Sequence, residues 1–366
     1  MSELYHLTLR SDAGECPVFV GAGALRQVES ELTAWSRRRT VFVLSSHPLH
    51  DIQAGLVETL SVEAAAVKSI WVPDGESAKT LEVAGETWRE MLRQGGKRDS
   101  RLVAIGGGTV GDLGGFVAAC FLRGIEFVQI PTTLLAQVDA SVGGKTAIDL
   151  PEGKNTVGAF HHPALVVSDT ELLSSLDRAE LRSGLVEVIK MAALLDPQQL
   201  DRVENQLEPL LAGDAEALAP VVADAAQTKI DVVQEDPLEK NRRRLLNFGH
   251  TLGHALEVAL GYAGLRHGEA VAYGMLFAMR LARTRSFPAA DETRLRALLA
   301  RLELPALPVV DVNAVMSAMQ RDKKAREGSL SWVLPTRIGG AEIVDGLSLS
   351  KVESELRAFL LASDPT

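Results

Sequence analysis

The feature that most constrains the fold is a change of pattern near residue 174. Before it, short runs rich in β-branched residues alternate with helical segments. Such alternation is typical of an α/β layer structure with a largely parallel sheet. After it, Ala, Leu, Glu and Arg dominate, and apolar residues recur at helical spacing. The sequence therefore predicts an α/β domain over residues 1–174 and an α-helical domain over residues 175–366.

Individual elements follow from the same patterns. Strands are predicted over residues 16–20, 40–44, 65–71, 102–105, 126–130 and 165–167. Helices are predicted over residues 23–35, 81–95, 178–195, 200–211, 215–234, 248–260, 268–284, 290–301 and 350–361. A hairpin of residues 329–334 and 341–344 is predicted to turn near Gly339. Because no linker or repeat separates the two halves, we expect them to pack closely, with a ligand site in the cleft between them.

Length and composition exclude several classes of protein. The chain has 366 residues and a formal net charge of −10, which does not favour non-specific binding of nucleic acid. Its two cysteines, Cys16 and Cys120, cannot form a disulfide framework or a cysteine-based zinc site. The N-terminus lacks a basic start followed by an apolar run, and no stretch reaches the ~18 apolar residues of a membrane helix. We expect a soluble, cytoplasmic protein.

One glycine-rich segment has the pattern of a phosphate-binding turn. Residues 106–111 read Gly-Gly-Gly-Thr-Val-Gly, after a predicted strand and before a helix expected to start near Asp112. Glycines in this context let the backbone approach a pyrophosphate at the helix N-terminus. The segment is not in the first strand–helix unit, and no acidic residue ends a strand about 20 positions later. A tight turn that packs a helix on the sheet is the alternative.

A second glycine-rich segment, residues 139–146, ends in Gly-Lys-Thr like a nucleotide-binding P-loop. Asp139 stands at the first required glycine, and its charge would repel a triphosphate, so a P-loop is not expected. Lys145, Lys154 and Asn155 instead offer two cations and an amide in one loop region. A solvated surface loop is the alternative.

Three of the eight histidines lie within 18 residues of one another. His250 and His254 share a helix face at i and i+4, and His267 opens the next helix. Neutral imidazoles with one carboxylate form a divalent-metal site, commonly zinc. Glu187, in an otherwise apolar helical stretch, is the candidate carboxylate because a buried carboxylate needs a cation. Spacing alone does not choose among the three histidines, and unliganded core or surface histidines remain the alternative.

Basic residues also occur where helices should be buried. Lys190 follows Glu187 by three positions, Lys229 interrupts an apolar run, and Arg243 lies in a run of three arginines. Clustered cations repel one another and favour a bound anion, so these residues are candidates for an anion pocket. Ion pairs on helix surfaces are the alternative.

Taken together, these segments resemble the 3-dehydroquinate synthase family of sugar phosphate cyclases. The resemblance runs from about residue 15 to residue 345, and the ordered set is far more specific than any one motif. The segments that carry it are residues 106–116 (GGGTVGDLGGF), 131–135 (PTTLL), 137–146 (QVDASVGGKT), 153–155 (GKN), 187–190 (EVIK), 247–254 (NFGHTLGH), 267–271 (HGEAV) and 321–324 (RDKK).

The resemblance implies a Rossmann-like N-terminal domain that binds NAD, an all-α C-terminal domain with a zinc or cobalt ion, and a homodimer. The implied reaction converts 3-deoxy-D-arabino-heptulosonate 7-phosphate to 3-dehydroquinate and phosphate in the shikimate pathway of aromatic amino acid biosynthesis. It proceeds through transient oxidation by NAD, elimination of phosphate, re-reduction and an intramolecular aldol closure. The implied substrate is thus a small sugar acid phosphate, with no nucleic-acid or membrane partner.

The resemblance also implies roles for individual residues. The implied metal ligands are Glu187, His250 and His267, which leaves His254 to contact substrate. The other implied substrate contacts are Arg123, Asp139, Lys145, Lys154, Asn155, Lys190, Lys229, Arg243, Asn247 and one of Lys323 and Lys324, with Lys324 preferred. The implied NAD contacts are Asp74, Glu76, Lys79, Gly107, Gly108, Asp112, Thr132 and Thr133, together with Lys145 and Lys154.

Departures from the family pattern are few. Asn241 stands where glycine is usual, and we expect it to keep a left-handed turn there. Ser175 and Asp177 stand where Thr and Pro are common, which leaves that loop on the NAD side less defined. Ser45 and Ser46 end the strand at which an acidic residue or Asn often meets the adenosine ribose.

Other functions remain open at this point. Sister cyclases that make aminodehydroquinate, 2-deoxy-scyllo-inosose or a valiolone share the expected fold and cofactors. The chain retains Lys229, Arg243, Asn247 and His254, a set that favours a substrate bearing a carboxylate and hence 3-dehydroquinate synthase. A metal-dependent polyol dehydrogenase and a non-catalytic binding protein with a vestigial site are more distant alternatives.

Overall fold

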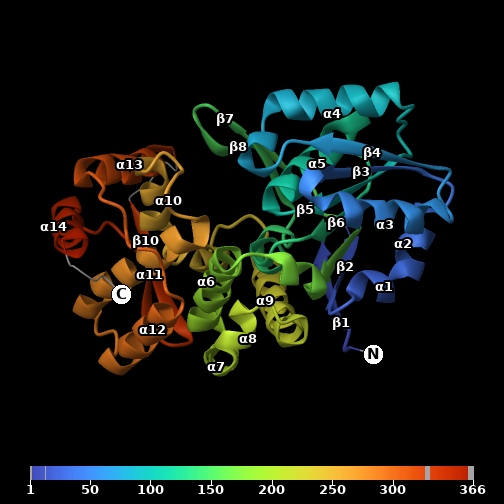
Figure 1. The fold of residues 1–366 in the computed structure, drawn as a ribbon. Coiled ribbons are helices and arrows are strands. Elements are labelled where there is room, and N and C mark those ends of the chain that lie inside the picture. The colour runs from blue at the N-terminus through green and yellow to red at the C-terminus, as the bar shows by residue number, and fades with distance from the viewer. Residues whose placement is uncertain (1, 13, 326–329, 362–366) are drawn as a thin grey trace. The chain divides into compact units, whose positions relative to one another are not determined.

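The structure is a computed structural model that describes residues 2–12, 14–325 and 330–361. The chain divides into two compact units, whose elements Figure 1 colours along the sequence. Unit 1 comprises Met1–Leu176 and Ala212–Ile230, and unit 2 comprises Asp177–Leu211 and Asp231–Thr366. None of the helices among the described residues combines the length and apolar character that a membrane crossing requires.

Unit 1 is built on a seven-stranded sheet with the strand order β1-β2-β9-β6-β5-β3-β4. β1 pairs antiparallel with β2, and every other neighbouring pair is parallel, as the alternation of strands and helices predicts. The strands are β1 (Tyr5–Ser11), β2 (Gly14–Gly21), β3 (Thr40–Ser46), β4 (Ala66–Val72), β5 (Arg101–Gly106), β6 (Phe127–Pro131) and β9 (Leu165–Asp169).

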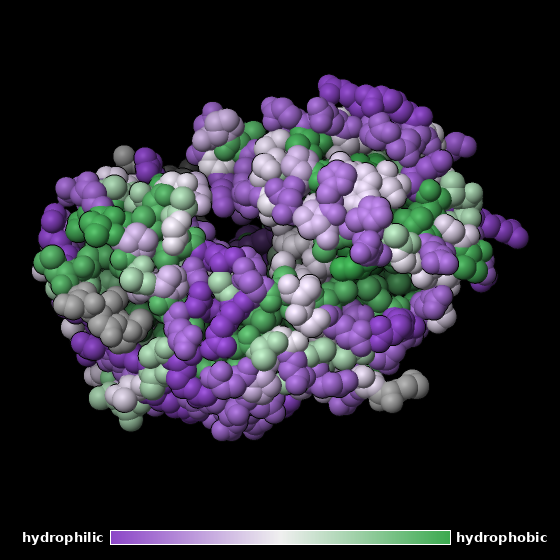
Figure 2. Space-filling view, in the orientation of Figure 1, coloured by the Kyte–Doolittle hydropathy of each residue, from purple (hydrophilic) through white to green (hydrophobic). Residues whose placement is uncertain are grey.

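Helices cover both faces of this sheet (Figure 1). They are α1 (Ala24–Gln27), α2 (Glu29–Ser36), α3 (His50–Ser61), α4 (Leu81–Arg93) and α5 (Gly108–Cys120). Alternate residues of β3 enter two separate cores, because successive side chains of a strand point to opposite faces. Phe42 and Leu44 pack with residues of α4 and α5, whereas Val41 and Val43 pack with residues of α1, α2 and α3. Figure 2 shows hydrophilic residues along the outer surface of α4, as expected of an amphipathic helix over a sheet.

Unit 1 also contains shorter helical elements, most of which follow the carboxyl ends of its strands. They are the 3-10 turns η1 (His47–Leu49), η2 (Gly75–Ala78), η3 (Phe121–Arg123) and η5 (Thr170–Ser175), and a π-helical segment, η4 (Ala136–Ala140). An antiparallel hairpin of β7 (Lys145–Leu150) and β8 (Gly153–Phe160) then follows η4, and β7 packs against α5. The hairpin carries Lys145, Lys154 and Asn155.

Unit 2 is helical apart from one hairpin, which agrees with the prediction for the C-terminal domain. α6 and α11 form its interior, since nearly every residue from Leu181 to Leu194 of α6 and from Gly268 to Ala282 of α11 is buried. The hairpin consists of β10 (Ser331–Arg337) and β11 (Gly340–Asp345). The helical elements are α6 (Arg178–Leu195), α7 (Pro197–Asn205), α8 (Leu207–Leu211), η6 (Arg242–Asn247), α10 (His250–Ala259), α11 (His267–Ala282), η7 (Arg283–Arg285), α12 (Ala289–Arg301), α13 (Val312–Ala325) and α14 (Leu349–Leu360).

The compact units differ from the expected domains in one segment. Residues 212–230, which the sequence pattern assigned to the second domain, belong to unit 1, and they include most of α9 (Ala215–Glu235). The contacts of this segment with the rest of unit 1 include a hydrogen bond and an ion pair. The Thr170 hydroxyl donates a 2.8 Å hydrogen bond to the Ala215 carbonyl, and the Lys229 ammonium contacts Asp139. Helical periodicity identified the helix but could not show which body it packs against.

The element predictions were incomplete in other places. The single helix expected over residues 23–35 is α1 and α2, separated at Val28 with φ −106° and ψ 22°. The helix expected over residues 200–211 is α7 and α8, separated at Gln206. The helix after the glycine turn begins at Gly108 rather than near Asp112. β1, α3, α13 and the β7–β8 hairpin were not predicted.

We predict that two glycine-to-alanine substitutions in helices of unit 1 will have opposite effects on stability. A Cβ at Gly114 of α5 would lie 2.6 Å from the Ala104 Cβ, whereas one at Gly85 of α4 would meet nothing within 4 Å. Gly114→Ala should therefore destabilise the protein by about 1–3 kcal/mol through overpacking. Gly85→Ala should stabilise it by about 0.5–1 kcal/mol through helix propensity. Thermal unfolding of both variants tests this, and a stabilised Gly114→Ala would contradict the packing described for α5.

Candidate metal and cofactor site

A carboxylate and two imidazoles converge inside unit 2. Glu187 lies in the middle of α6, and His250 and His267 are the first residues of α10 and α11. The Glu187 Oε1 atom is 3.8 Å from the His250 Nε2 atom and 3.7 Å from the His267 Nε2 atom. Ligand atoms of a tetrahedral zinc ion stand roughly 3.3–3.5 Å apart. The three side chains thus have the chemistry and nearly the spacing of a three-ligand metal centre.

Both imidazoles are held so that their Nε2 atoms face Glu187. The His250 Nδ1 atom is 3.2 Å from the Phe248 carbonyl, and the His267 Nδ1 atom is 3.4 Å from the Glu257 Oε1 atom. A ligating histidine ordinarily donates its other ring N–H to a carbonyl or carboxylate, which fixes its orientation. Glu257 was not singled out from the sequence, although its place on α10, three residues after His254, puts it on the same helix face.

The two imidazoles have opposite pKa shifts. Burial lowers the pKa of His250 well below 6.5, and the nearby Lys190 charge lowers it further. Burial also acts to lower the pKa of His267, but the hydrogen bond and negative charge of Glu257 outweigh it and raise that pKa. His250 is therefore neutral at physiological pH, the form that a metal ligand requires.

The Glu187 carboxylate is fully buried, with both oxygens lacking a hydrogen-bond partner among the described residues. Its compensating charge is the Lys190 ammonium, which forms an ion pair with Oε2, while Oε1 faces the two imidazoles. Because an ionised buried carboxylate is costly without cationic partners, a metal ion at Oε1 fits this environment.

A second three-residue group overlaps the first. His254, Glu257 and His267 also place one ligand atom each within 4.8 Å of the others, but the His254 side chain is exposed. His254 lies beside the other two histidines, with its ring centroid 5.0 Å from that of His250 and 5.9 Å from that of His267. The geometry brings all three predicted histidines together, and His254 is the most exposed of them.

In unit 1, the glycine turn has the predicted strand–turn–helix context. β5 ends at Gly106, and Gly107 precedes the first turn of α5 without a side-chain hydrogen bond that caps this fully described helix. A Cβ at Gly107 would stand 3.2 Å from the Thr133 side chain, which shows how closely this backbone packs on the loop after β6. Free amide groups at a helix N-terminus, without side chains around them, fit a phosphate of a dinucleotide. The segment with the Gly-Lys-Thr ending leads from η4 into β7, so it forms no P-loop.

A buried lysine joins the glycine-turn helix to the β7–β8 hairpin. The Lys79 ammonium donates to the Asp112 Oδ2 atom at 2.5 Å and to the Asn155 amide oxygen, and its side chain is only 5% exposed. Asn155 has a left-handed φ of 55°, and its backbone N–H donates to the Asp149 Oδ1 atom at 2.7 Å. Burial raises the pKa of Asp112, an effect that the Lys79 charge opposes. Lys79 thus ties together one predicted cofactor contact and one predicted substrate contact.

Two predicted carboxylates of unit 1, Glu76 and Asp74, also have polar partners. The Lys154 ammonium lies 3.1 Å from the Glu76 Oε1 atom, and the Glu76 Oε2 atom accepts a 3.2 Å hydrogen bond from the Thr109 hydroxyl. Burial acts to raise the pKa of Glu76, but the charge and hydrogen bond of Lys154, together with the Lys79 charge, lower it overall. At the end of β3, the Ser46 hydroxyl donates to the Asp74 Oδ1 atom at 3.0 Å, so a carboxylate stands beside the strand end where the sequence lacks one.

The π-helical segment η4 positions Asp139. The Lys229 ammonium, on the buried side of α9, contacts both the carboxylate and the backbone carbonyl of Asp139. The Gln137 amide donates to the Pro131 carbonyl at 3.1 Å and to the Asp169 carbonyl at 2.9 Å, which fixes η4 to the ends of β6 and β9. π-helical turns are frequent at functional sites. Gln137 is therefore a residue that shapes the site and that sequence patterns did not identify as such.

In unit 2, Asp236 shapes the loop before η6. Its carboxylate accepts backbone N–H groups of Lys240 at 2.9 Å, Asn241 at 2.6 Å and Arg243 at 3.1 Å. The prediction of a left-handed conformation at Asn241 was wrong. Asn241 has φ −136° and ψ −104°, and Glu239, with φ 57°, takes the left-handed conformation instead. The three hydrogen bonds to Asp236 dictate the loop geometry, which the residue preference of Asn could not reveal.

The remaining predicted residues differ in exposure. Lys190 and Arg243 are buried in unit 2, and the Asn247 amide donates to the Glu239 Oε1 atom at 2.7 Å. In unit 1, Thr132 is buried, Thr133 and Gly108 are half-buried, and Lys145 and Arg123 are exposed, the latter with φ 76°. The side chains of Lys323 and Lys324 on α13 lie outside the described part of the structure.

Comparison with known proteins points to one family. The family of 3-dehydroquinate synthase N-terminal domains matches residues 69–183, and that of 3-dehydroquinate synthase C-terminal domains matches residues 184–325. The 3-dehydroquinate synthase of Symbiobacterium thermophilum is 44% identical over 353 residues, which cover 94% of this chain and 97% of the relative.

Solved structures of sugar phosphate cyclases share the fold. A 2-deoxy-scyllo-inosose synthase complexed with carbaglucose-6-phosphate, NAD⁺ and Co²⁺ has a TM-score of 0.88 at 25% identity, covering 97% of this chain and 99% of that one. The 2-epi-5-epi-valiolone synthase of Streptomyces hygroscopicus subsp. jinggangensis, with NAD⁺ and Zn²⁺ bound, has a TM-score of 0.79 at 30% identity, covering 89% of this chain and 91% of that one.

We predict that Glu257 controls how firmly His267 can hold a metal ion. Glu257→Leu removes the acceptor for the His267 Nδ1 atom, and loss of such an outer partner typically weakens metal affinity by about 10–100-fold. Glu257→Gln keeps a neutral acceptor, so its metal affinity should lie between those of the wild-type protein and Glu257→Leu. Titration of the metal-free protein with Co²⁺ measures the effect, and an unchanged affinity in Glu257→Leu would contradict this role.

Proposed function

Since this chain belongs to the 3-dehydroquinate synthase family, we propose that it converts 3-deoxy-D-arabino-heptulosonate 7-phosphate to 3-dehydroquinate and phosphate, with NAD and a divalent zinc or cobalt ion as cofactors. The observation that carries the proposal is the group of buried Glu187 with half-buried His250 and His267, whose donor atoms suit such an ion. NAD supplies a reversible hydride acceptor when bound, and the metal supplies a Lewis acid at the substrate oxygens.

Residues around the glycine turn would hold NAD. The amides at the start of α5, with Gly107 and Gly108, suit the pyrophosphate. Asp74, oriented by the Ser46 hydroxyl, suits a ribose hydroxyl, because a carboxylate accepts such hydrogen bonds. We assign the other NAD contacts to Glu76, Lys79, Asp112, Thr132, Thr133, Lys145 and Lys154.

Cationic side chains would hold the two anionic ends of the substrate. We assign the phosphate to Arg123, Lys154 and Lys324, and the carboxylate and ring hydroxyls to Lys145, Lys229 and Arg243, because charge-assisted hydrogen bonds to such oxygens are strong. Asp139, Asn155, Lys190, Asn247 and His254 complete the proposed contacts. The pairing of Lys229 with Asp139 and of Lys154 with Glu76 stabilises these ammonium groups in the positions described.

A sister cyclase remains the second candidate, because two of the similar solved structures are cyclases with other products. Identity favours 3-dehydroquinate synthase, at 44% against 25% and 30%. The proposed carboxylate contacts Lys229, Arg243 and Asn247 also favour an acid substrate. We further propose a cytoplasmic homodimer that acts in the shikimate pathway, on the basis of the family resemblance.

The proposed reaction predicts release of one phosphate per 3-dehydroquinate while NAD is used catalytically. The purified protein, mixed with the heptulosonate phosphate, Co²⁺ and a substoichiometric amount of NAD, should consume many equivalents of substrate without net accumulation of NADH. Phosphate and 3-dehydroquinate are measured directly. No phosphate release, or NADH accumulation with a polyol, would contradict the proposal in favour of a non-catalytic protein or a polyol dehydrogenase.

Removal of the proposed carboxylate ligand should abolish metal binding without unfolding unit 1. Glu187→Ala should abolish metal retention and turnover while unit 1 stays folded, because the substitution removes the carboxylate that faces both imidazoles and Glu187 lies in unit 2. Glu292→Ala is the matched control, since Glu292 is also a buried carboxylate of unit 2 but pairs with Arg283 and Arg296. Metal content by mass spectrometry should fall only in Glu187→Ala, and normal content there would refute its role as a ligand.

A further inference from the structure

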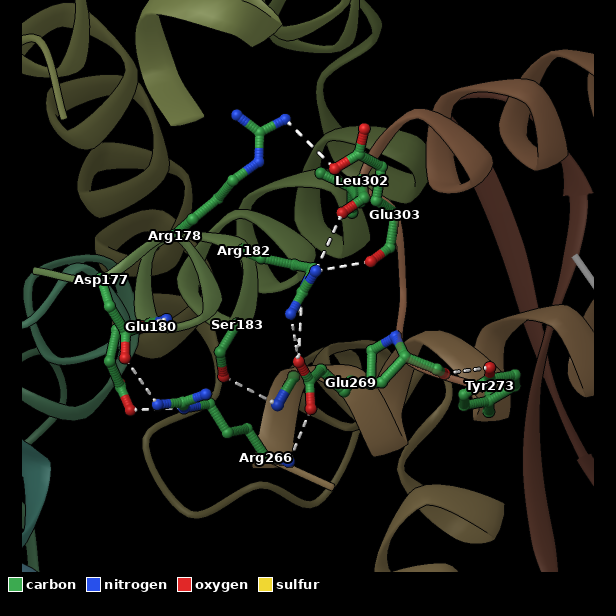
Figure 3. A network of polar contacts seen from close by, with 12 residues as sticks. Asp177, Arg178, Glu180, Arg182, Ser183, Arg266, Glu269, Tyr273, Leu302 and Glu303 are labelled. Carbon is green, nitrogen blue, oxygen red and sulfur yellow. Dashed lines mark hydrogen bonds and ion pairs between the residues drawn. The ribbon is translucent and has the colours of Figure 1, made fainter. Parts of the chain in front are cut away.

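Seven residues fasten the first turn of α11 to the first half of α6 (Figure 3). We call them the α6–α11 clasp: Asp177, Glu180, Arg182, Ser183, Arg266, Gly268 and Glu269. The clasp lies within unit 2 and next to the proposed metal centre, because His267 stands between Arg266 and Gly268 and Glu187 follows Ser183 by one helical turn.

The innermost part of the clasp is a backbone contact. The Gly268 N–H donates to the Ser183 hydroxyl at 3.0 Å, and a Cβ at Gly268 would lie 2.1 Å from the Ser183 carbonyl oxygen. Only glycine permits α11 to approach α6 this closely. The contact therefore fixes the residue after His267 against the turn of α6 that precedes Glu187.

The middle part is a buried ion pair. The Glu269 side chain is 4% exposed, and its Oε1 atom lies 2.9 Å from the Arg182 guanidinium while its Oε2 atom accepts the Arg266 backbone N–H at 2.9 Å. Arg182 also donates to the carbonyls of Leu302 and Glu303, so both ends of the pair are satisfied (Figure 3). The hydrogen bond from the Arg266 backbone N–H to Glu269 thus fixes the residue before His267.

The outer part is the guanidinium of Arg266, which reaches back to the start of α6. Its Nε atom donates to the Glu180 Oε1 atom at 2.7 Å, and its Nη2 atom donates to the Asp177 Oδ2 atom at 2.9 Å. The other carboxylate oxygen of Asp177 accepts the Glu180 N–H at 2.7 Å and so caps α6. Arg266 thus joins the N-termini of the two helices that carry Glu187 and His267.

We propose that the α6–α11 clasp sets the separation of Glu187 and His267 and thereby the affinity of the metal centre, with Arg266 as a positioning residue. This inference rests on the proposed metal centre. His267 is held through its backbone on both sides, and its imidazole is directed by Glu257. Loosening the outer contact frees the first turn of α11 to move relative to α6, which spreads the ligand atoms. Weaker metal binding follows, because affinity depends on how well the outer contacts orient the ligands.

The test compares two arginines at opposite ends of α11. Arg266→Met removes the two outer ion pairs of the clasp, and Arg280→Met removes the 2.6 Å ion pair of Arg280 with Glu355 near the other end of the same helix. Metal-free full-length protein is titrated with Co²⁺ against a chromophoric chelator, and thermal unfolding is measured in parallel. Both variants should lose similar thermal stability. The Co²⁺ dissociation constant should rise about tenfold in Arg266→Met, the low end of outer-partner effects, and stay unchanged in Arg280→Met.

Two further variants make the outcome decisive. Arg266→Lys, which keeps one ion pair, should restore part of the affinity, and Ser183→Ala should weaken Co²⁺ binding in the same direction as Arg266→Met. Wild-type affinity and an unaltered Co²⁺ absorption spectrum in both Arg266→Met and Ser183→Ala would overturn the clasp proposal alone. If the wild-type protein binds no Co²⁺, the proposed metal centre fails and the clasp proposal falls with it.

Discussion

The arrangement of unit 2 depends on how the charge of the buried Glu187 carboxylate is compensated. A fully buried carboxylate without hydrogen bonds is unfavourable unless positive charge or metal ligands surround it. Lys190 supplies the charge from the same helix, three residues away, whereas His250 and His267 approach from the starts of two other helices. α6, α10 and α11 must therefore keep their relative positions for Glu187 to remain compensated.

The fold could be predicted where side-chain periodicity alone decides it. The bounds expected for α6 match the structure at both ends, because its apolar pattern and the Asp177 cap mark it clearly. β1 and β8 were missed because their burial patterns are mostly exposed or half-buried, so neither shows the apolar run of an interior strand. The assignment of residues 212–230 failed for another reason: Thr170 and Asp139, which hold this segment, lie far away in the sequence.

The sequence indicated which residue types form the candidate site, but not which hydrogen bonds orient them. Histidine spacing and the mid-helix Glu187 indicated a metal centre, and the family resemblance chose among the histidines. The sequence did not identify the partners that orient these groups, since Glu257, Gln137 and Asp236 act through hydrogen bonds whose geometry only the folded chain defines. The conformation of Asn241 illustrates the limit, because three backbone hydrogen bonds to one carboxylate overrode a local preference.

Although the formal net charge of the chain is −10, most of the residues predicted to bind anions are lysines and arginines. Four of the lysines assigned to substrate or cofactor contact an acidic side chain within their own unit: Lys79 with Asp112, Lys154 with Glu76, Lys229 with Asp139, and Lys190 with Glu187. The pairs of Lys79, Lys229 and Lys190 allow these three lysines to be buried without an external anion. If these lysines bind substrate as proposed, an anionic substrate has to compete with internal carboxylates, and a dianion should then gain more than an analogue with a single negative charge.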